Sequence, residues 1–357
     1  MTSPMPAAGD ASLARATVSV VVPVLNAAGT LPACLAALAR LDPRPVEILF
    51  VDNGSVDGSP SIIQAFQRDR PSIPARVLIE PRRGASVARN RGIQAAKGDI
   101  IAFTDSDCAP DPAWLRHLMQ PFADPAIAAV AGRIVATPAR TTVELFSALY
   151  TLQSSDKPAR YERWSPWEGG FPTANFAARK VVLEKLRGFD EAVCIYGEDY
   201  DLCARMYAQG AVIAYAPEAV TSHHHRTTVG GMVRQAFGFG RSHPYLLSRH
   251  ARSGLWLDLP RRSFVLPRFP LPAWLDLASA DKKVLAVLVL SAWYGPALWL
   301  MAPLALWLVI EASRRARRRG MPVKVAAVGL AGLLLLKSSA MTAGRWWGSV
   351  KYKVLCL

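Results

Sequence analysis

Short apolar runs alternate with helical patterns through the first 110 or so residues of this 357-residue chain. β-Branched or continuously apolar runs that end in turn residues predict strands at 18–25, 46–51, 76–80 and 100–103. Apolar residues at helical spacing predict helices from Leu31 to Leu41 after an N-cap at Thr30, around 61–68, and from about Ser86 to Ala96. This alternation predicts a parallel sheet with helices on both faces, and the all-apolar run at 100–103 indicates a strand buried on both sides.

Polar residues follow three of these strands directly, and the carboxyl ends of parallel strands meet at the edge where open α/β sheets bind ligands. Neighbouring carboxylates repel each other unless a cation lies between them, and a hard divalent metal carrying phosphate oxygens is the natural partner. Thr104-Asp-Ser-Asp107 alone is equally well explained as an ordinary turn. Three strands that end in polar segments on one edge favour a nucleotide-and-metal site. The polar residues at these three strand ends are Asn26, Asp52, Asp57, Asp105 and Asp107.

Further helices are predicted at 114–119, 142–152, 181–186 and after Gly197, and further strands at 126–135, 171–178 and 212–215. The charged, aromatic stretch at 156–170 is predicted to be a loop. Glu198, Asp199 and Asp201 stand in the first turn of a predicted helix, where the helix macrodipole favours acidic residues. This preference alone is enough to explain the presence of one or two of these three acidic residues.

The C-terminal third is far more apolar. Residues 228–283 are predicted to form an amphipathic, interfacial linker, and 284–357 to form membrane helices with a basic tail. Residues 284–310 carry no charge over 27 positions, which exceeds the ~20 that a spanning helix needs. The second apolar run, 325–336, is shorter. A buried pair of soluble helices remains the alternative.

The arginines between Arg314 and Arg319 bear on the membrane topology. A single crossing would place them on the side opposite the preceding domain, against the positive-inside rule. A hairpin bent near Gly295-Pro296 would return them to the same side. Hairpin-like or short membrane helices are therefore favoured over two ordinary spans.

The chain carries 42 basic and 27 acidic residues, a net charge of +15, which points to nucleotide phosphates, nucleic acid or an anionic membrane as partner. Because much of the excess lies near the C-terminus, a membrane surface explains that part best, and no nucleic acid is expected. Five scattered cysteines fit reduced thiols. Residues 1–16 have no signal-peptide core and predict a disordered lead. Neither GxGxxG nor a P-loop is present.

Six short motifs occur in the order found in family-2 glycosyltransferases, which the chain resembles between Val18 and Pro244. The resemblance implies the GT-A fold, a mixed, mainly parallel sheet flanked by helices. It also implies a nucleotide-sugar donor, a Mg2+ or Mn2+ ion and inversion at the anomeric carbon. The motifs are Pro23-Val-Leu-Asn26, Val51-Asp-Asn-Gly-Ser55, Ala88-Arg-Asn-Arg-Gly92, Thr104-Asp-Ser-Asp107, Gly188-Phe-Asp190 and Gly197-Glu-Asp-Tyr-Asp201.

The resemblance also implies roles for individual residues. Asp107 would ligate the metal, and Asp105 would contact the ribose and share in the metal site. Asp199 would be the general base, while Glu198 would hold the acceptor or exchange roles with Asp199. The donor nucleotide would be lined by Pro23, Val24, Asn26, Asp52, which would bond the base, and Gly84, and the acceptor side would include Asn175 and Trp167.

His223 follows the last predicted strand and resembles the third metal ligand of some GT-A enzymes. On an extended segment His223 and His225 would face the same side, but a surface loop containing three histidines explains them equally well. Arg234, Gln235 and Arg241 depart from the QxxRW pattern of processive synthases, which favours the transfer of one sugar at a time.

Two other functions fit part of the pattern. A sugar nucleotidyltransferase would need a basic, glycine-rich first loop, and residues 26–30 are not basic. A catalytically silent membrane scaffold would tolerate the loss of Asp107 and Asp199, yet both are present. The sequence therefore predicts a membrane-bound inverting glycosyltransferase that acts on a lipid-linked or cell-envelope glycan acceptor. Residues 17–227 would face the cytoplasm at the inner membrane.

Overall fold

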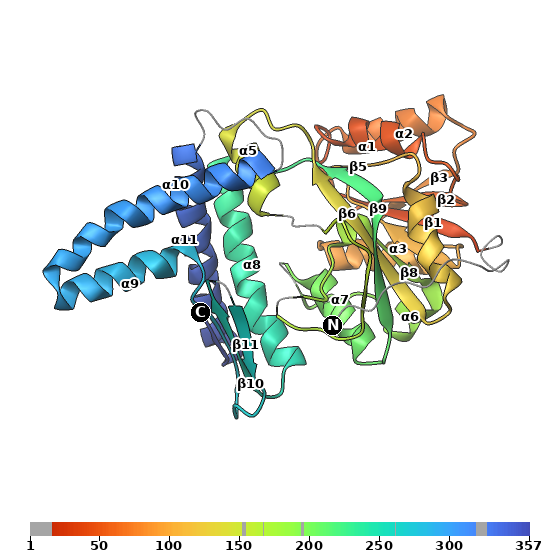
Figure 1. The fold of residues 1–357 in the computed structure, drawn as a ribbon. Coiled ribbons are helices and arrows are strands. Elements are labelled where there is room, and N and C mark those ends of the chain that lie inside the picture. Colours follow the sequence, from red (N-terminus) through yellow and green to blue (C-terminus); the bar gives the residue numbers. More distant parts are fainter. Residues whose placement is uncertain (1–15, 152–154, 167, 194–195, 261, 319–326) are drawn as a thin grey trace. The chain divides into compact units, whose positions relative to one another are not determined.

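The computed structural model describes residues 16–151, 155–166, 168–193, 196–260, 262–318 and 327–357. Residues 1–15 of the predicted lead and Trp167 lie outside these ranges. The chain divides into two compact units, which Figure 1 shows with their elements labelled. The first comprises Met1–Thr137, Gln153–Cys194 and Glu198–His224, and the second comprises Pro138–Leu152, Ile195–Gly197 and His225–Leu357.

A nine-stranded mixed sheet forms the centre of the first unit, in the order β3-β2-β1-β4-β8-β6-β9-β5, with β7 added beside β9. The first four strands are mutually parallel, as the alternating pattern predicts. β8 is antiparallel to both β4 and β6, and β6 runs parallel to β9. The strands are β1 (Val18–Val24), β2 (Glu47–Asp52), β3 (Ala75–Ile79), β4 (Ile100–Phe103), β5 (Cys108–Pro110), β6 (Ile127–Ala136), β7 (Ala159–Tyr161), β8 (Phe176–Arg179) and β9 (Val212–His223).

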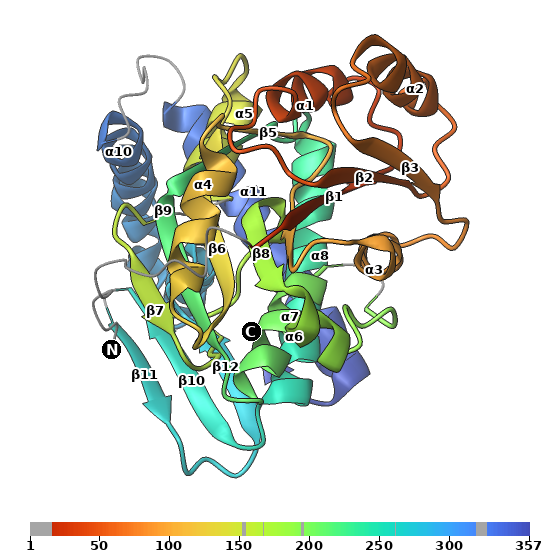
Figure 2. The ribbon, with the colours of Figure 1, turned by 90° about the vertical axis from the view of Figure 1, so that its right-hand side faces the viewer.

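Helices cover both faces of this sheet, and Figure 2 shows α1 and α2 on one side of β1 to β3 and α3 on the other. Val20 and Val22 of β1 pack in one buried cluster with Leu31 and Trp114, whereas Val21 packs in a second cluster with Ala88. Successive strand residues point to opposite faces, so the uninterrupted apolar run serves two cores. The helices are α1 (Leu31–Leu38), α2 (Ser59–Asp69), α3 (Ala85–Ala95), α4 (Trp114–Met119), α6 (Lys180–Lys185) and α7 (Glu198–Tyr207), with 3-10 turns η2 (Gln120–Ala123) and η3 (Thr173–Asn175).

Three local expectations in the first unit were wrong. The stretch at 156–170 was predicted to be a loop, but it contains β7 at Ala159–Tyr161. The Thr30 side chain does not cap α1; its hydroxyl donates to the Ala27 carbonyl oxygen at 3.3 Å instead. The last strand does not end at Tyr215 but continues to His223. Pro217 looks like a strand end in the sequence, but it lies where the β6–β9 register shifts, and an irregularity of this kind tolerates a proline.

Gly92 of α3 lies very close to β1. A Cβ atom at this position would stand 2.4 Å from the Val21 Cγ1 atom. We expect Gly92→Ala to lower the free energy of unfolding by about 1–3 kcal/mol, because overpacking forces the helix away from the sheet. Urea denaturation measures the change. Gly29→Ala is the matched control, since a Cβ at Gly29 meets nothing within 4 Å. Equal stability of the two variants would contradict this account of the packing.

The second unit combines helices with a small sheet. Residues 228–283, predicted to be an amphipathic linker, contain one long helix and three strands. The four-stranded sheet has the order β11-β10-β12-β13, in which only β10 and β11 pair antiparallel. The elements are α5 (Thr142–Tyr150), α8 (Val229–His250), β10 (Gly254–Leu259), β11 (Arg262–Leu266), β12 (Pro272–Asp276), α9 (Ala280–Trp293), η4 (Gly295–Leu300), α10 (Met301–Arg318), α11 (Ala327–Tyr352) and β13 (Leu355–Cys356).

Glycines bring α8 and α11 into close contact. A Cβ at Gly240 would stand 2.0 Å from the Met341 carbonyl oxygen, and one at Gly344 would stand 2.2 Å from the Phe237 carbonyl oxygen. Small residues at helix interfaces let two backbones approach in this way. One side of α11 is therefore occupied by protein along much of its length.

α9 and α10 form a hairpin. α9 ends at Trp293 and η4 begins at Gly295, so the predicted bend near Gly295-Pro296 is confirmed. In the described part of the chain, Gly295–Arg317 and Ala327–Tyr352 are long and apolar enough to cross a membrane by length and composition.

Candidate functional site

The loops after β1 and β2 are held together at the carboxyl edge of the sheet. Asn26 adopts a left-handed conformation with φ +49°, which asparagine tolerates better than most residues. The Asn26 Oδ1 atom accepts a hydrogen bond from the Val56 amide at 2.9 Å, and its own amide donates to the Ser55 hydroxyl at 3.1 Å. The Asp52 Oδ1 atom accepts from the Ser55 amide at 3.1 Å. The structure thus brings the predicted residues Asn26 and Asp52 to one shared turn.

Asn53 also organises this edge, and the sequence reasoning assigned it no role. Its side-chain amide donates to the carbonyl oxygens of Glu80 and Arg82 at 2.9 and 2.7 Å. Its Oδ1 atom accepts from the Gly84 amide at 2.8 Å. Gly84 has φ +143°, a conformation that essentially only glycine adopts. The hydrogen bonds of Asn53 therefore hold the 80–84 loop, including Gly84, at the same edge of the sheet as Asp52. The presence of Asn53 in the motif at 51–55 was the sequence signal that could have revealed this role.

Pro23 and Val24 lie on the same strand but contribute less surface. The Val24 side chain is fully buried in the core, and its carbonyl oxygen accepts from the Asn53 amide at 2.9 Å. Pro23 is half-buried. The Val24 side chain therefore offers no exposed surface to a nucleotide.

Arg89 links two acidic residues that are far apart in the sequence. Its guanidinium donates to the Asp105 Oδ1 atom at 2.9 Å and to the Glu198 Oε1 atom at 2.9 Å. The Arg89 side chain is 6% exposed, so these pairs are largely shielded from water. Burial opposes the charge, but the carboxylates of Asp105 and Glu198 outweigh it and raise the Arg89 pKa, which keeps the group a cation. The carboxyl end of β4 and the start of α7 thereby meet at one guanidinium.

The role of Arg89 was not predicted, although it belongs to the motif at 88–92. An arginine on the buried face of a short helix needs charged partners, and that was the signal available in the sequence. Its neighbour Asn90 supports the same arrangement. The Asn90 Oδ1 atom accepts from the Phe189 amide at 2.8 Å, and its side-chain amide donates to the Phe189 carbonyl oxygen at 2.9 Å. α3 therefore holds the 188–191 segment that leads toward α7.

Asp107 and His223 form a candidate metal pair. The His223 Nε2 atom lies 3.6 Å from the Asp107 Oδ1 atom, and both side chains are partly buried. The pairing of β5 with β9 sets Cys108 opposite His223, and the His224 amide donates to the Asp107 carbonyl oxygen at 2.9 Å. The extension of β9 beyond Tyr215 is thus what brings His223 to Asp107.

The chemistry of these donors fits a hard divalent ion. Asp107, Cys108 and His223 each offer one ligand atom, and these atoms lie within 4.8 Å of one another. Burial raises the pKa of the Cys108 thiol well above its usual value, and the carboxylates of Asp107 and Asp105 raise it further. A protonated thiol is a poor ligand, which leaves the carboxylate and the imidazole, donors that Mg2+ or Mn2+ accepts.

Asp199 differs from its neighbour Glu198. Burial, together with the nearby Glu198 carboxylate, raises the Asp199 pKa to about 7 against the opposing charge of Arg89. The Asp199 Oδ1 atom accepts a hydrogen bond from the Tyr200 amide at 2.9 Å. A carboxyl group with a pKa near neutrality can take up and release protons at physiological pH. Glu198 is instead held by Arg89.

The remaining predictions concern Asn175, His225 and Trp167. Asn175 is 1% exposed, and its side chain makes interior hydrogen bonds. Its Oδ1 atom accepts from Trp114 Nε1 at 2.7 Å, and its amide donates to the carbonyl oxygens of Arg133 and Ala219. His225 is buried and belongs to the second unit. Trp167 lies outside the described residues.

Comparisons with known proteins find similarity to glycosyltransferases. The family model described as "Glycosyl transferase family 2" matches residues 19–187. A pre-mycofactocin glycosyltransferase of Mycobacterium tuberculosis is 33% identical over 237 residues, which is 65% of this chain and 48% of that protein. The chain therefore spans about half the length of that relative. The glycosyltransferase AglE of Haloferax volcanii is 28% identical over 63% of this chain and 72% of its own length.

Among solved structures, the fold resembles that of the mannosyltransferase PcManGT from Pyrobaculum calidifontis, in complex with GDP-Man and Mn2+. The TM-score is 0.62 at 22% sequence identity, and the match covers 93% of this chain and 88% of the other. This likeness confirms the predicted mixed α/β fold.

Proposed function

We propose that the protein is an inverting glycosyltransferase of family 2 that uses a nucleotide-sugar donor, since residues 19–187 match the model of that family. The observation that supports it most is the guanidinium of Arg89, which holds Asp105 and Glu198 at 2.9 Å each. It joins the acidic edge suited to a metal and diphosphate to the turn that carries Asp199. This link supports a single site for the donor and the proton acceptor.

In the proposed reaction, the loops around Asn26, Asp52 and Gly84 bind the nucleotide. Asp107 and His223 would hold a Mg2+ or Mn2+ ion, which, when bound, offsets the charge on the departing diphosphate. Asp199 accepts the proton of the acceptor hydroxyl as that oxygen attacks the anomeric carbon. The bond from the anomeric carbon to the diphosphate oxygen breaks on the opposite face, so one displacement inverts the configuration.

Asp199 is the better of the two candidates for the base. Its pKa of about 7 lets it be ionised before the reaction and hold a proton after it. Glu198 is held by an ion pair with a buried arginine, and in this proposal it keeps the start of α7 in position. A direct contact between Glu198 and the acceptor remains compatible with that role.

The rate of transfer at saturating donor is expected to rise with pH through about 7. Asp199 must be ionised to accept a proton, and burial together with Glu198 raises its pKa to about 7. In Glu198→Gln the rising limb is expected at lower pH, because the carboxylate that raises the Asp199 pKa is gone. A pH profile of kcat measures both effects, with the surface variant Asp69→Asn as control. A limb that moves to higher pH in Glu198→Gln would contradict the assignment.

A donor panel tests the function itself. Membranes containing the full chain are incubated with UDP-, GDP- and dTDP-sugars and Mn2+ or Mg2+, and release of the nucleoside diphosphate is measured. Release above that of an Asp107→Ala control supports the proposal. Release of pyrophosphate from a sugar phosphate and a nucleoside triphosphate would instead show a nucleotidyltransferase. Absence of turnover with every donor would favour the silent scaffold.

The proposed acceptor is a lipid-linked or cell-envelope glycan at the inner membrane, with the first unit facing the cytoplasm. The two long apolar helices of the second unit support this placement. Nucleotide sugars are made in the cytoplasm, and the described cysteines Cys34, Cys108, Cys203 and Cys356 are free thiols, as expected in a reducing compartment. An acceptor held in the bilayer would meet such an enzyme at the membrane surface.

A further inference from the structure

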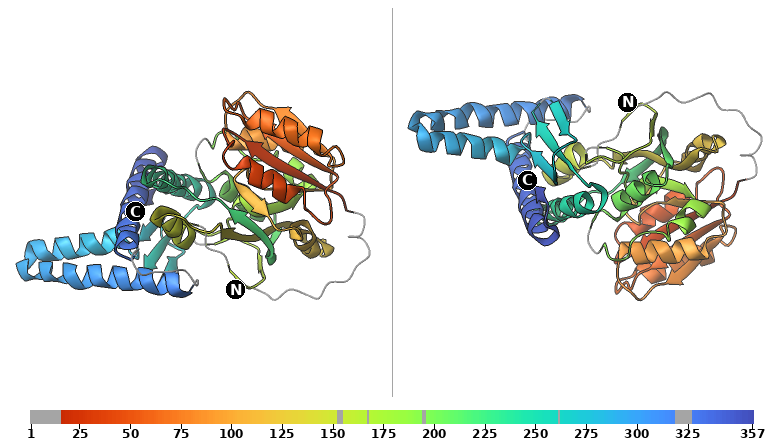
Figure 3. Two further views of the ribbon diagram at one scale, coloured as in Figure 1. Left: turned by 90° about the horizontal axis from the view of Figure 1, so that it is seen from above. Right: turned by 90° about the horizontal axis from the view of Figure 1, so that it is seen from below.

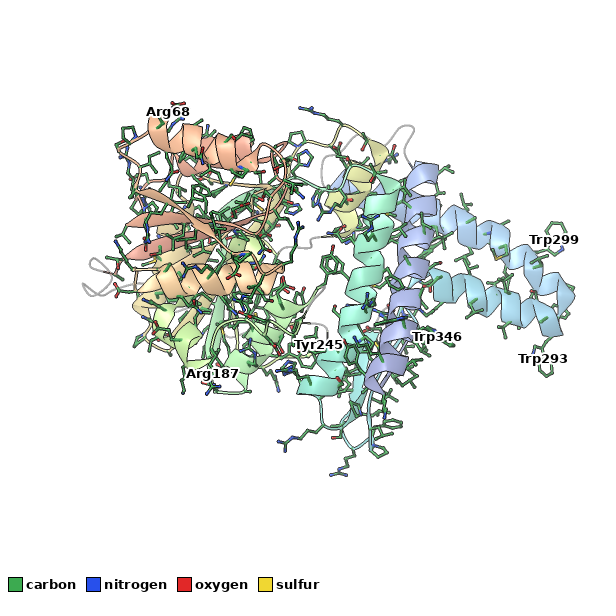
Figure 4. The ribbon with its side chains drawn as sticks, turned by 180° about the vertical axis from the view of Figure 1, so that it is seen from behind. Arg68, Arg187, Tyr245, Trp293, Trp299 and Trp346 are labelled. Carbon is green, nitrogen blue, oxygen red and sulfur yellow. The ribbon has the colours of Figure 1, made fainter. Side chains whose placement is uncertain are left out.

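The tip of the α9–α10 hairpin exposes large aromatic residues. Trp293 is 91% exposed and Trp299 is 82% exposed, and Figure 4 shows both at the far end of the hairpin. Leu285, Val289 and Leu306 along its length are also exposed. A soluble domain rarely leaves so much contiguous apolar surface in water. This surface fits an apolar medium.

The base of the hairpin is polar. The Asp281 carboxylate accepts hydrogen bonds from the hydroxyls of Ser338 and Thr342 on α11, and it pairs with Lys282 at 3.1 Å. The Lys283 ammonium lies over the Trp307 ring, 4.6 Å from its centre. Lysine beside tryptophan is typical of the level where lipid headgroups meet hydrocarbon.

The two ends of the hairpin opposite its tip, namely the start of α9 and the end of α10, carry basic residues. The first turn of α9 carries Lys282 and Lys283 beside Asp281, and the last turns of α10 carry arginines at 314, 315 and 317. Positive charge at one end and an uncharged aromatic tip at the other match a leaflet whose headgroups are anionic. The hairpin thus carries a polar-to-apolar gradient along its own axis.

The α9 arm of the hairpin is too short to cross a bilayer, although the η4–α10 arm is long enough. α9 has 14 residues, which at 1.5 Å per residue gives a length of about 21 Å. The hydrocarbon core is about 30 Å thick. A tip that enters from one side therefore stops inside the bilayer.

α11 lies steeply across the hairpin. Figure 1 shows the long axis of α11 crossing those of α9 and α10, and Figure 3, from above, shows α11 nearly end-on while the hairpin lies in the plane of view. Two helices that cross steeply cannot both run along the membrane normal. α11 also packs on α8 with one side and exposes Trp346 and Val350 on another, as an interfacial helix does.

We infer that the α9–α10 hairpin inserts into a single leaflet of an anionic membrane and that α11 lies along the surface of that leaflet. The chain before α9 and the chain after α10 then remain on the same side. This makes the protein monotopic, although two of its helices are long enough to span. The inference rests on the proposed function in one respect only, the identification of that side as the cytoplasmic one.

Labelling of cysteines in membrane vesicles tests the topology. Arg317→Cys, after α10, and Arg68→Cys, in the first unit, are each made in the full chain with Cys194 replaced by Ser; both arginines are exposed. A membrane-impermeant maleimide is added to inside-out and to right-side-out vesicles. We expect both cysteines to react from the same face. Reaction of Arg317→Cys only from the opposite face would establish α10 as a span and overturn the inference.

The same experiment separates this inference from the proposed function. If both cysteines react from the outer face, the single-leaflet hairpin stands and cytoplasmic use of a nucleotide sugar fails. If Arg317→Cys reacts from neither face in membranes but reacts after denaturation, the end of α10 is not at the surface and the inference is overturned. None of these results depends on the enzyme being active.

Binding to vesicles tests the insertion of the tip. Purified protein is floated with liposomes of phosphatidylcholine containing phosphatidylglycerol. Trp293→Ser with Trp299→Ser is expected to weaken partitioning at least about tenfold, because two exposed indoles no longer enter the leaflet. Val181→Ser in the first unit, 66% exposed, is the control and should bind like the unchanged protein. Unchanged partitioning of the double tryptophan variant would contradict tip insertion.

Discussion

Asp199→Asn is expected to lower kcat by about 10²–10⁴-fold, the usual contribution of a general base. The amide keeps the size of the carboxyl group but cannot accept the proton of the acceptor hydroxyl. The donor dissociation constant should change little, because in our proposal Asp199 faces the acceptor and not the nucleotide. Single-turnover rates and donor binding, measured on the same preparation, check the two halves of this prediction.

The matched control is Asp69→Asn, because Asp69 is exposed and lies at the end of α2, away from the site residues. It should retain full activity. Glu198→Gln decides the alternative in which the two acidic residues exchange roles. Full transfer by Asp199→Asn together with a large loss in Glu198→Gln would make Glu198 the base.

Asp107→Ala is expected to weaken metal-dependent donor binding by about 10²-fold or more, since loss of even an outer-shell partner of a metal ligand costs 10–100-fold. The fold should survive, because the interstrand hydrogen bond at this position uses the Asp107 carbonyl oxygen and not its side chain. Titration of the purified variant with Mn2+ in the presence of donor measures the loss. It should appear in binding as well as in kcat, unlike the loss in Asp199→Asn.

His223→Ala tests whether His223 is a metal ligand or only lies beside Asp107. If His223 helps to hold the ion, this variant should also need more Mn2+, with a smaller effect than Asp107→Ala because a single neutral donor is lost. Asp111→Ala is the control, since its side chain accepts from the Ala113 amide in the adjacent turn. Wild-type metal dependence in Asp107→Ala would remove the metal assignment altogether.

The strands of the first unit were largely predictable from the sequence. β1, β2 and β4 are buried on both faces, so they appear as continuous apolar runs, and α4 falls at the predicted residues. Burial of a whole strand is a local requirement that composition expresses directly. The polar residues at the strand ends followed from the same pattern, because parallel strands share an edge.

Other features depended on long-range pairing. The extension of β9 past Pro217 is made possible by a register shift against β6 and by its pairing with β5. The small sheet of the second unit includes β13 from the last residues of the chain, paired with β12. Strand pairs of this kind are stabilised by partners distant in sequence, so the local pattern carries little sign of them.

The sequence by itself determined the parallel half of the sheet, its polar edge and the apolar C-terminal helices, because burial and turn chemistry act on neighbouring residues. Only the tertiary structure decided that Arg89 joins Asp105 to Glu198, that His223 reaches Asp107, and that Asn175 is an interior hydrogen-bonding residue. It also set α11 across the hairpin, so that length alone no longer implies two membrane spans. These features arise from side chains and axes that meet only after folding, and residue order does not encode their distances.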